Sequence, residues 1–269
     1  PKACIHPVYK WGQAVDVRVD VKPLLKLSIS DLKASREKGV RAEQLKHQGC
    51  SAAVLRAAGY TAGELRNAGY TAGDLRHAGY TASELKAAEF SPKDLKEAGF
   101  SSRSLRSAGF SPADLKAAGF SAAELKSAGY PIEALKQAGY SAAELRVAGF
   151  SAKDLKSSGF SAQALKAAGF SAGNLKQAGF DAGALKAAGY TAQDLRIAGL
   201  SPAALKAAGF SASDLNHAGY TRGDLVRAGF TPSELAAAGL SYSGSAAMCS
   251  LERARQAREK GVSLAALKG

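Results

Sequence analysis

The feature that most constrains this chain is a ten-residue period. Between Cys50 and Leu240, leucine occupies the same phase in all nineteen decapeptides, from Leu55 to Leu235, and glycine closes every one except that ending at Glu89. We number the repeat so that position 1 is the residue whose number ends in zero. Each unit of such an array is one small structural element that buries its apolar face only against its neighbours. The core is therefore expected to be a long seam.

The residues at the other positions predict one short helix per repeat. Position 2 is Ser or Thr in seventeen of the nineteen units, which is the preference of a helix N-cap, and position 5 is acidic in twelve, as in a capping box. Glycine at position 10 is typical of the left-handed residue that ends a helix. Position 3 is Ala in most units and proline in four, which suits the first helical residue. These prolines are Pro92, Pro112, Pro202 and Pro232.

The apolar positions predict how these helices pack. Ala at positions 3 and 9 and Leu at position 6 form one stripe, and the aromatic residue at position 1 flanks it. Position 7 is Lys or Arg in sixteen units, near the negative end of its own helix. We therefore expect an all-α solenoid of about twenty helices of seven or eight residues, with two units per turn.

A β-helix is the competing interpretation. The decapeptide also resembles two copies of the motif of pentapeptide-repeat proteins, in which the residue two before the central Leu points inward. Here that residue is often long and charged, as in Lys93, Arg103 and Glu133, and burying it unpaired is costly. Four prolines at one phase also remove ladder hydrogen bonds. We rank this second; the array looks like a short-repeat α-helical solenoid, a resemblance that is silent on activity.

The chain divides into four parts. Residues 1–26 lie outside the repeat, and the alternating valines Val15 to Val21 predict an extended arm. Residues 27–49 form N-terminal capping repeats, the first with a helix about one turn longer. Residues 50–240 are the decapeptide solenoid, and 241–269 are a linker and capping helices. The ends are the most basic parts of a chain whose formal net charge is +13.

Several units depart from the pattern. Pro131 replaces the N-cap, and Glu89 should strain or reshape the turn that glycine normally makes; either could bend the array. Asn216, Val226 and Ala236 stand where Lys or Arg is expected. We expect a transition to the C-terminal cap there, and a contact surface is the alternative.

The three cysteines have no paired spacing, so we expect no disulfide scaffold and an intracellular, reducing compartment. Cys50, at the aromatic position, is expected to be a small buried residue. The sequence starts at Pro1, so an organelle is a further option if a targeting segment was removed. No apolar run is long enough to span a bilayer.

No catalytic motif is visible, and we expect neither an enzyme nor a metal or cofactor site. His77 and His217, at variable position 8, are expected to face solvent. The preferred function is a non-catalytic scaffold or linker, a basic rod that docks on acidic proteins in a large assembly and is not obviously a homo-oligomer. An RNA-binding solenoid that uses the position 7 stripe is the alternative, and an enzyme accessory or ligand-binding subunit is a third. The candidate partner-binding residues are Lys10, Trp11, Arg18, Lys22, Lys26, Arg253, Arg255 and Arg258.

Overall fold

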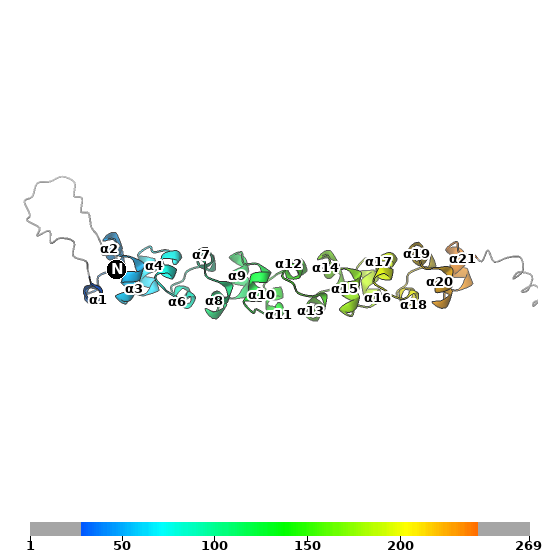
Figure 1. Cartoon of the computed structure of the whole chain (residues 1–269), viewed down its shortest axis with the longest axis horizontal. Coiled ribbons are helices and arrows are strands. Elements are labelled where there is room, and N and C mark those ends of the chain that lie inside the picture. The colour runs from blue at the N-terminus through cyan, green and yellow to red at the C-terminus, as the bar shows by residue number, and fades with distance from the viewer. Residues whose placement is uncertain (1–27, 242–269) are drawn as a thin grey trace, which may run out of the picture. The chain divides into compact units, whose positions relative to one another are not determined.

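The computed structural model describes residues 28–241, and these residues form an all-helical repeat array with no strand among them. It confirms one helix per decapeptide (Figure 1). The chain divides into two compact units, which meet between Ser151 and Ala152. The predicted N-terminal arm and the C-terminal linker and capping helices lie outside the described residues.

The first unit contains helices α1 to α12 and the second contains α13 to α21. Apart from α1, each described helix is six residues long, slightly shorter than expected, because the residues at positions 9 and 10 belong to the closing turn. The bounds are α1 Ile29–Glu37, α2 Ala42–His47, α3 Ala52–Ala57, α4 Ala62–Asn67, α5 Ala72–His77, α6 Ala82–Ala87, α7 Pro92–Glu97, α8 Ser102–Ser107, α9 Pro112–Ala117, α10 Ala122–Ser127, α11 Ile132–Gln137, α12 Ala142–Val147, α13 Ala152–Ser157, α14 Ala162–Ala167, α15 Ala172–Gln177, α16 Ala182–Ala187, α17 Ala192–Ile197, α18 Pro202–Ala207, α19 Ala212–His217, α20 Arg222–Arg227 and α21 Pro232–Ala237.

The ends of each helix follow the predicted chemistry. In α5, the Thr71 hydroxyl accepts from the Asp74 N–H at 3.1 Å, and the Asp74 carboxylate accepts from the Thr71 N–H at 2.9 Å. At the other end, Gly79 has a φ of 91°, similar to the 93° of Gly59 and the 81° of Gly69. The N–H of Tyr80 donates to the carbonyl of Leu75 at 3.0 Å. This is the Schellman closure, so the capping box and the turn together define the helix.

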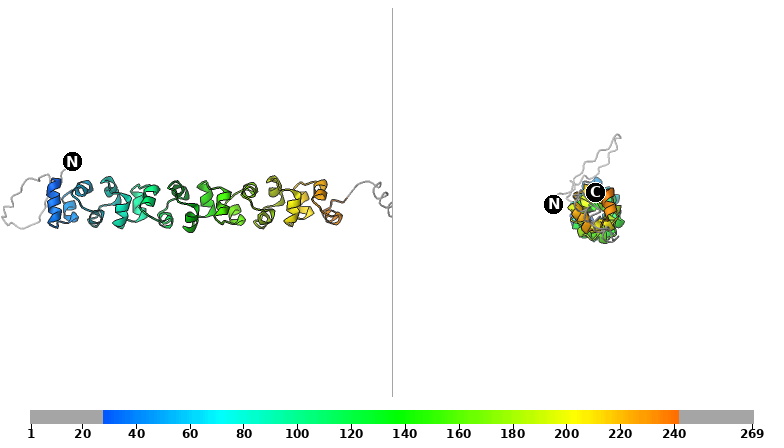
Figure 2. Two further views of the ribbon diagram at one scale, coloured as in Figure 1. Left: turned by 90° about the horizontal axis from the view of Figure 1, so that it is seen from below. Right: turned by 90° about the vertical axis from the view of Figure 1, so that its right-hand side faces the viewer.

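Within each unit, successive helices alternate between two sides, and each packs on its sequence neighbour and on the helix two repeats away (Figures 1 and 2). Helix α4, for example, contacts α2, α5 and α6. Leu65 and its equivalents are fully buried, and Ala62 and Tyr60 lie beside it in the core. The apolar stripe and the two-repeat stacking are thus confirmed within each unit.

The first described helix is the exception in length. Helix α1 has nine residues, three more than the others, and it starts with a capping box between Ser28 and Asp31. The expected extension by about one turn is confirmed. Leu32 is fully buried, whereas Lys33 and Lys38 are exposed. The first helix therefore buries one leucine, and its exposed residues include Ile29, which is 47% exposed, as well as polar ones.

The two irregular repeats keep the common geometry. Pro131 takes N-cap angles (φ −71°, ψ 154°) like those of the serines, and α11 has six residues, although no side chain caps it. Glu89 adopts φ 59°, the left-handed region that glycine occupies elsewhere, and its turn keeps the Phe90 to Leu85 hydrogen bond at 3.0 Å. Of the two expected outcomes, strain or a reshaped turn, the structure shows strain, because a non-glycine residue keeps the left-handed backbone of the common turn.

Cys50 is buried, as expected, and only 4% of it is exposed. It is also disulfide-bonded, which the cysteine spacing did not predict.

Replacing Glu89 with glycine should stabilise the protein. The substitution relieves the left-handed strain, worth about 1–2 kcal/mol, and the gain is reduced by the greater flexibility of unfolded glycine, about 0.4–1 kcal/mol. It also removes an ion pair with Arg66 (3.2 Å) in which Glu89 is 84% exposed, so this loss is small. We expect the free energy of unfolding in urea to rise by about 0.5–1 kcal/mol. A fall would mean that the Arg66 pair outweighs the strain.

Candidate interaction surface

The Lys or Arg side chain at position 7 does not bind the carbonyls at the end of its own helix. It extends to the end of the helix two repeats further along the chain. Lys86 of α6 donates to the carbonyl of Gly109 at 2.5 Å, beyond the end of α8, and its ammonium lies 4.7 Å from the centre of the Phe110 ring. We call this arrangement the cation clamp. It satisfies carbonyls that a short helix leaves free, places a positive charge at the negative helix end and adds a cation–π contact.

The cation clamp recurs in both units. Arg76 donates to the carbonyl of Ala98 at position 9, at 2.9 Å, whereas Lys126 donates to the carbonyls of both position 9 and position 10. The described cation–ring pairs in which a carbonyl also accepts are Lys46–Tyr70, Arg56–Tyr80, Arg76–Phe100, Lys86–Phe110, Lys96–Phe120, Arg106–Tyr130, Lys116–Tyr140, Lys126–Phe150, Lys156–Phe180, Lys166–Tyr190, Lys186–Phe210, Arg196–Tyr220 and Lys206–Phe230. Several of these side chains, such as Arg76 and Lys86, remain exposed to solvent while they bind the backbone and ring two repeats further on.

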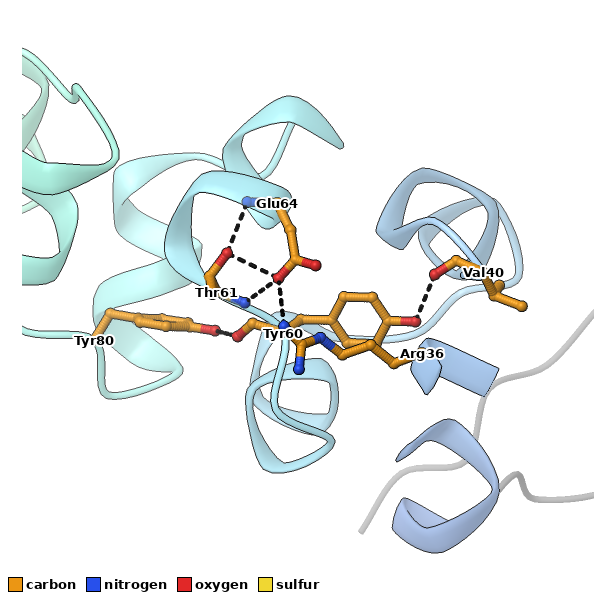
Figure 3. Close-up of polar contacts among 6 residues, drawn as sticks. All are labelled: Arg36, Val40, Tyr60, Thr61, Glu64 and Tyr80. Carbon is orange, nitrogen blue, oxygen red and sulfur yellow. Dashed lines mark hydrogen bonds and ion pairs between the residues drawn. The ribbon is translucent and has the colours of Figure 1, made fainter. Parts of the chain in front are cut away.

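Tyrosine at position 1 makes the opposite connection. The Tyr60 hydroxyl donates backwards to the carbonyl of Val40 at 2.8 Å, and the Tyr80 hydroxyl donates to the carbonyl of Tyr60 (Figure 3). Figure 3 also shows Arg36 reaching Glu64, which holds the capping box of Thr61. Sequence reasoning missed the tyrosine bonds, because Phe and Tyr both occur at position 1 with no visible pattern.

Burial of these hydroxyls changes their acidity. Burial, with a smaller contribution from the nearby Asp74 carboxylate, raises the pKa of Tyr70 to about 12. Burial also raises the pKa of Tyr140 to about 12, and the carboxylates of Glu144 and Glu124 add to the effect. Both hydroxyls therefore remain protonated donors at alkaline pH values where an exposed tyrosine would ionise.

The last described cation clamp is that of Lys206, which donates to the carbonyl of Gly229 at 2.5 Å and covers Phe230. The next position 7 residue, Asn216, carries no charge, and Arg222, at position 3, donates from Nε to the carbonyl of Leu240 at 3.2 Å. Lys176 donates to the carbonyls of Ala198 and Gly199 before the non-aromatic Leu200, so the carbonyl bonds do not require an aromatic residue at position 1.

The variable positions 4 and 8 come together in grooves between helices two repeats apart. One groove of about 550 Å³ includes Gly63 at position 4, Ala87 at position 8 and Arg56. A second, of about 450 Å³, places Ser213 opposite Ala237 in the same way. A third, of about 370 Å³, has Glu43 and Asn67 at these positions. The residues at positions 4 and 8 differ from groove to groove, whereas each groove lies between two helices that are two repeats apart.

Few Lys or Arg side chains among the described residues take no part in a cation clamp or another polar contact. Five side chains are exposed and show no hydrogen bond, ion pair or ring contact among the described residues: Lys33 on α1, Lys38 and Arg41 between α1 and α2, Lys93 and Lys153. Three of the five lie within nine residues of each other at the first two helices. They adjoin residues 1–27, which contain five Lys or Arg and two Asp.

The predicted partner-binding residues Lys10, Trp11, Arg18, Lys22, Lys26, Arg253, Arg255 and Arg258 all lie outside the described residues. His77 and His217 are exposed, as expected. Among residues 28–241 no group of acidic, histidine and cysteine side chains is arranged to hold a metal ion. In the same part of the chain, no helix has the length and apolar character needed to cross a membrane.

The capped six-residue helices, the left-handed closing residue and the cation clamp together define a helical-repeat protein with a ten-residue unit. The profile of the family described as decapeptide repeat region matches residues 39–112, 99–172 and 169–242. These matches cover more than half of the chain, which therefore belongs to the decapeptide-repeat family. No curated protein matches it.

The cation clamp predicts a stability cost for neutralising position 7. In Lys186→Met the alkyl chain is kept, but the bond to the Gly209 carbonyl (2.5 Å) and the charge 4.8 Å from the Phe210 ring centre are lost. We expect the free energy of unfolding in urea to fall by about 1–2 kcal/mol. The matched control Lys153→Met removes an exposed lysine of the same unit and should change it by less than about 0.5 kcal/mol. Equal effects would show that the cation clamp contributes nothing.

The raised tyrosine pKa values predict alkaline destabilisation. An unfolded tyrosine ionises near pH 10, whereas Tyr70 and Tyr140 have a pKa of about 12 in the folded chain. Their contribution to stability is therefore complete below pH 10 and is lost as the pH rises through 12. The fall in unfolding free energy between pH 10 and 12 should be smaller in the Tyr70→Phe/Tyr140→Phe double variant. The difference in absorbance at 295 nm between the parent and the double variant would follow the ionisation of Tyr70 and Tyr140. If these two tyrosines ionised near pH 10 in the folded protein, the burial argument would be contradicted.

Proposed function

We infer that the protein is a non-catalytic scaffold or linker that binds acidic protein partners through the N-terminal end of the array. The observation that supports this best is the distribution of cations without a structural partner. Within the described residues, the position 7 side chains bind carbonyls and aromatic rings of other repeats. Lys33, Lys38 and Arg41, by contrast, are exposed close together on α1 and in the turn before α2. The adjoining residues 1–27 add a net charge of +3.

The engagement of position 7 weakens the RNA alternative. A nucleic-acid track needs cations that can reach successive phosphates and release counterions. Here each clamped cation already contacts a carbonyl and, in most repeats, a ring, and the aromatic residues are in or next to the core. Binding RNA along this stripe would break contacts that hold the repeats together. Acidic proteins at the N-terminal end require no such exchange.

Binding of a polyglutamate peptide at low salt tests the inference. We expect the affinity to fall by about 3–10-fold in Lys33→Gln/Lys38→Gln, because two cations of the contact surface are lost. The control Lys93→Gln/Lys153→Gln removes the same charge from exposed sites elsewhere and should bind like the parent. Absence of binding by the parent, or equal losses in both variants, would refute the inference. Tighter binding of polyuridylate with a steep salt dependence would support the RNA alternative instead.

The predicted intracellular, reducing compartment remains a prediction, and the oxidation state of Cys50 in the native protein tests it, because disulfides persist mainly in oxidising compartments. Thiol labelling of the denatured native protein, with and without prior reduction, would show whether Cys50 is oxidised where the protein resides.

A further inference from the structure

The second unit has two sides whose helices begin differently. Among its described helices, α14, α16 and α18 contact one another in succession, and α15, α17, α19 and α21 do the same. Each helix of the latter set has a capping box, closed by Asn174, Asp194, Asp214 or Glu234. In the former set position 5 is alanine, and no helix has a capping box. We call α14, α16 and α18 the unboxed side and α15, α17, α19 and α21 the boxed side.

The alanine at position 5 leaves a backbone donor without its acceptor at the start of each unboxed helix. On the boxed side, the N–H of Thr191 donates to the Asp194 carboxylate at 2.9 Å. At α18 the Ser201 hydroxyl still accepts from the N–H of Ala204 at 3.2 Å, but Ala204 offers no acceptor side chain to the N–H of Ser201. Half of the capping box is therefore absent, and the same holds in α14 and α16.

The same replacement removes a charge contact across the stack. On the boxed side, Lys206, which forms a cation clamp, lies 3.4 Å from the Glu234 carboxylate of α21. On the unboxed side, Lys176 donates to the carbonyl of Gly199 at 2.8 Å, and the residue that corresponds to Glu234 is Ala204. The contact of Lys176 with the start of α18 therefore lacks the ion pair that accompanies the cation clamp at α21.

The two sides are otherwise alike. We name Leu165, Leu185 and Leu205 the unboxed leucines, and Leu175, Leu195 and Leu215 the boxed leucines. All six are fully buried, and the N–H of each donates to the carbonyl of its N-cap residue at 3.0–3.1 Å. Each side also accepts one tyrosine bond, at Phe170 from Tyr190 and at Leu200 from Tyr220. Packing therefore does not offset the difference in capping.

We propose that the second unit opens from its unboxed side, where the first turns of α14, α16 and α18 unfold locally while those of α15, α17 and α19 stay closed. A lost capping-box bond and a lost charge contact each lower the free energy needed to open a turn. Helix α20, which contacts α18, has a capping box between Thr221 and Asp224, so the unboxed side ends there.

Opening of the first turns on one side lets the helices of that side separate. The second unit is then a one-sided hinge, which takes up bending without loss of the contacts on the boxed side. The opening does not depend on the proposed scaffold role, but a scaffold between two partners is where such a hinge has a use.

Hydrogen exchange of the full chain, followed by NMR at single amides, tests the proposal. The unboxed leucines should have protection factors about 3–10-fold lower than the boxed leucines, because their turns open more often. The hydrogen bonds compared have nearly the same length, and the side chains have the same burial. A difference in exchange therefore reports opening of the turn and not a difference in the closed structure.

Restoring the carboxylates should close the unboxed side. The variant Ala164→Glu/Ala204→Glu recreates at α14 and α18 the capping box of α12. It should raise the protection of the unboxed leucines of these two helices by about 3–10-fold. The control Ala167→Glu/Ala207→Glu adds the same charges at exposed position 8 of the same helices and should not raise it.

Three results would overturn the proposal. The first is equal protection of the unboxed and boxed leucines in the parent. The second is an unchanged difference in Ala164→Glu/Ala204→Glu, and the third is a rise of similar size in the control. Protection of the boxed leucines in every variant shows that the unit itself is folded.

Discussion

A six-residue helix leaves more of its backbone unpaired than it pairs, because the first four N–H groups and the last four carbonyls have no partner within it. Each part of this repeat supplies hydrogen-bond partners for these free N–H and carbonyl groups. Thr71 and Asp74 satisfy the start of α5, and the turn at Gly79 and Tyr80 satisfies part of its end. The remaining carbonyls accept from a cation two repeats before. Helices too short to be stable alone thereby become stable in series.

The offset of two repeats explains features that a single decapeptide does not. Position 7 reaches forward and tyrosine at position 1 reaches backward, so every helix within a unit depends on the helix two places away as well as on its neighbour. Because position 7 donates only toward later repeats and tyrosine only toward earlier ones, each helix has two chemically different faces along the stack.

Regularity is a poor guide to function in this chain. The repeated Lys and Arg residues resemble a nucleic-acid track in the sequence, yet Lys86 and its equivalents hold the framework together. The cations that remain, such as Lys33 and Lys38, are those that the repeat does not require. Sequence reasoning predicted that positions 4 and 8 are the variable ones. It could not show that Gly63 and Ala87 share a groove, because they belong to different repeats and meet only through stacking.

The sequence by itself determined the helix in each repeat, its N-cap, its closing glycine and its buried leucine, because these depend on residues at most five apart. It also indicated the longer α1 and the strain at Glu89, since a charged side chain replaces glycine at a left-handed position. Tertiary structure alone decided the partners of position 7, the tyrosine bonds and the polarity of the two faces. Those contacts join residues 20 to 24 apart, such as Tyr60 with Val40 and Lys86 with Phe110. Their pairing is set by how helices stack, which no single repeat encodes.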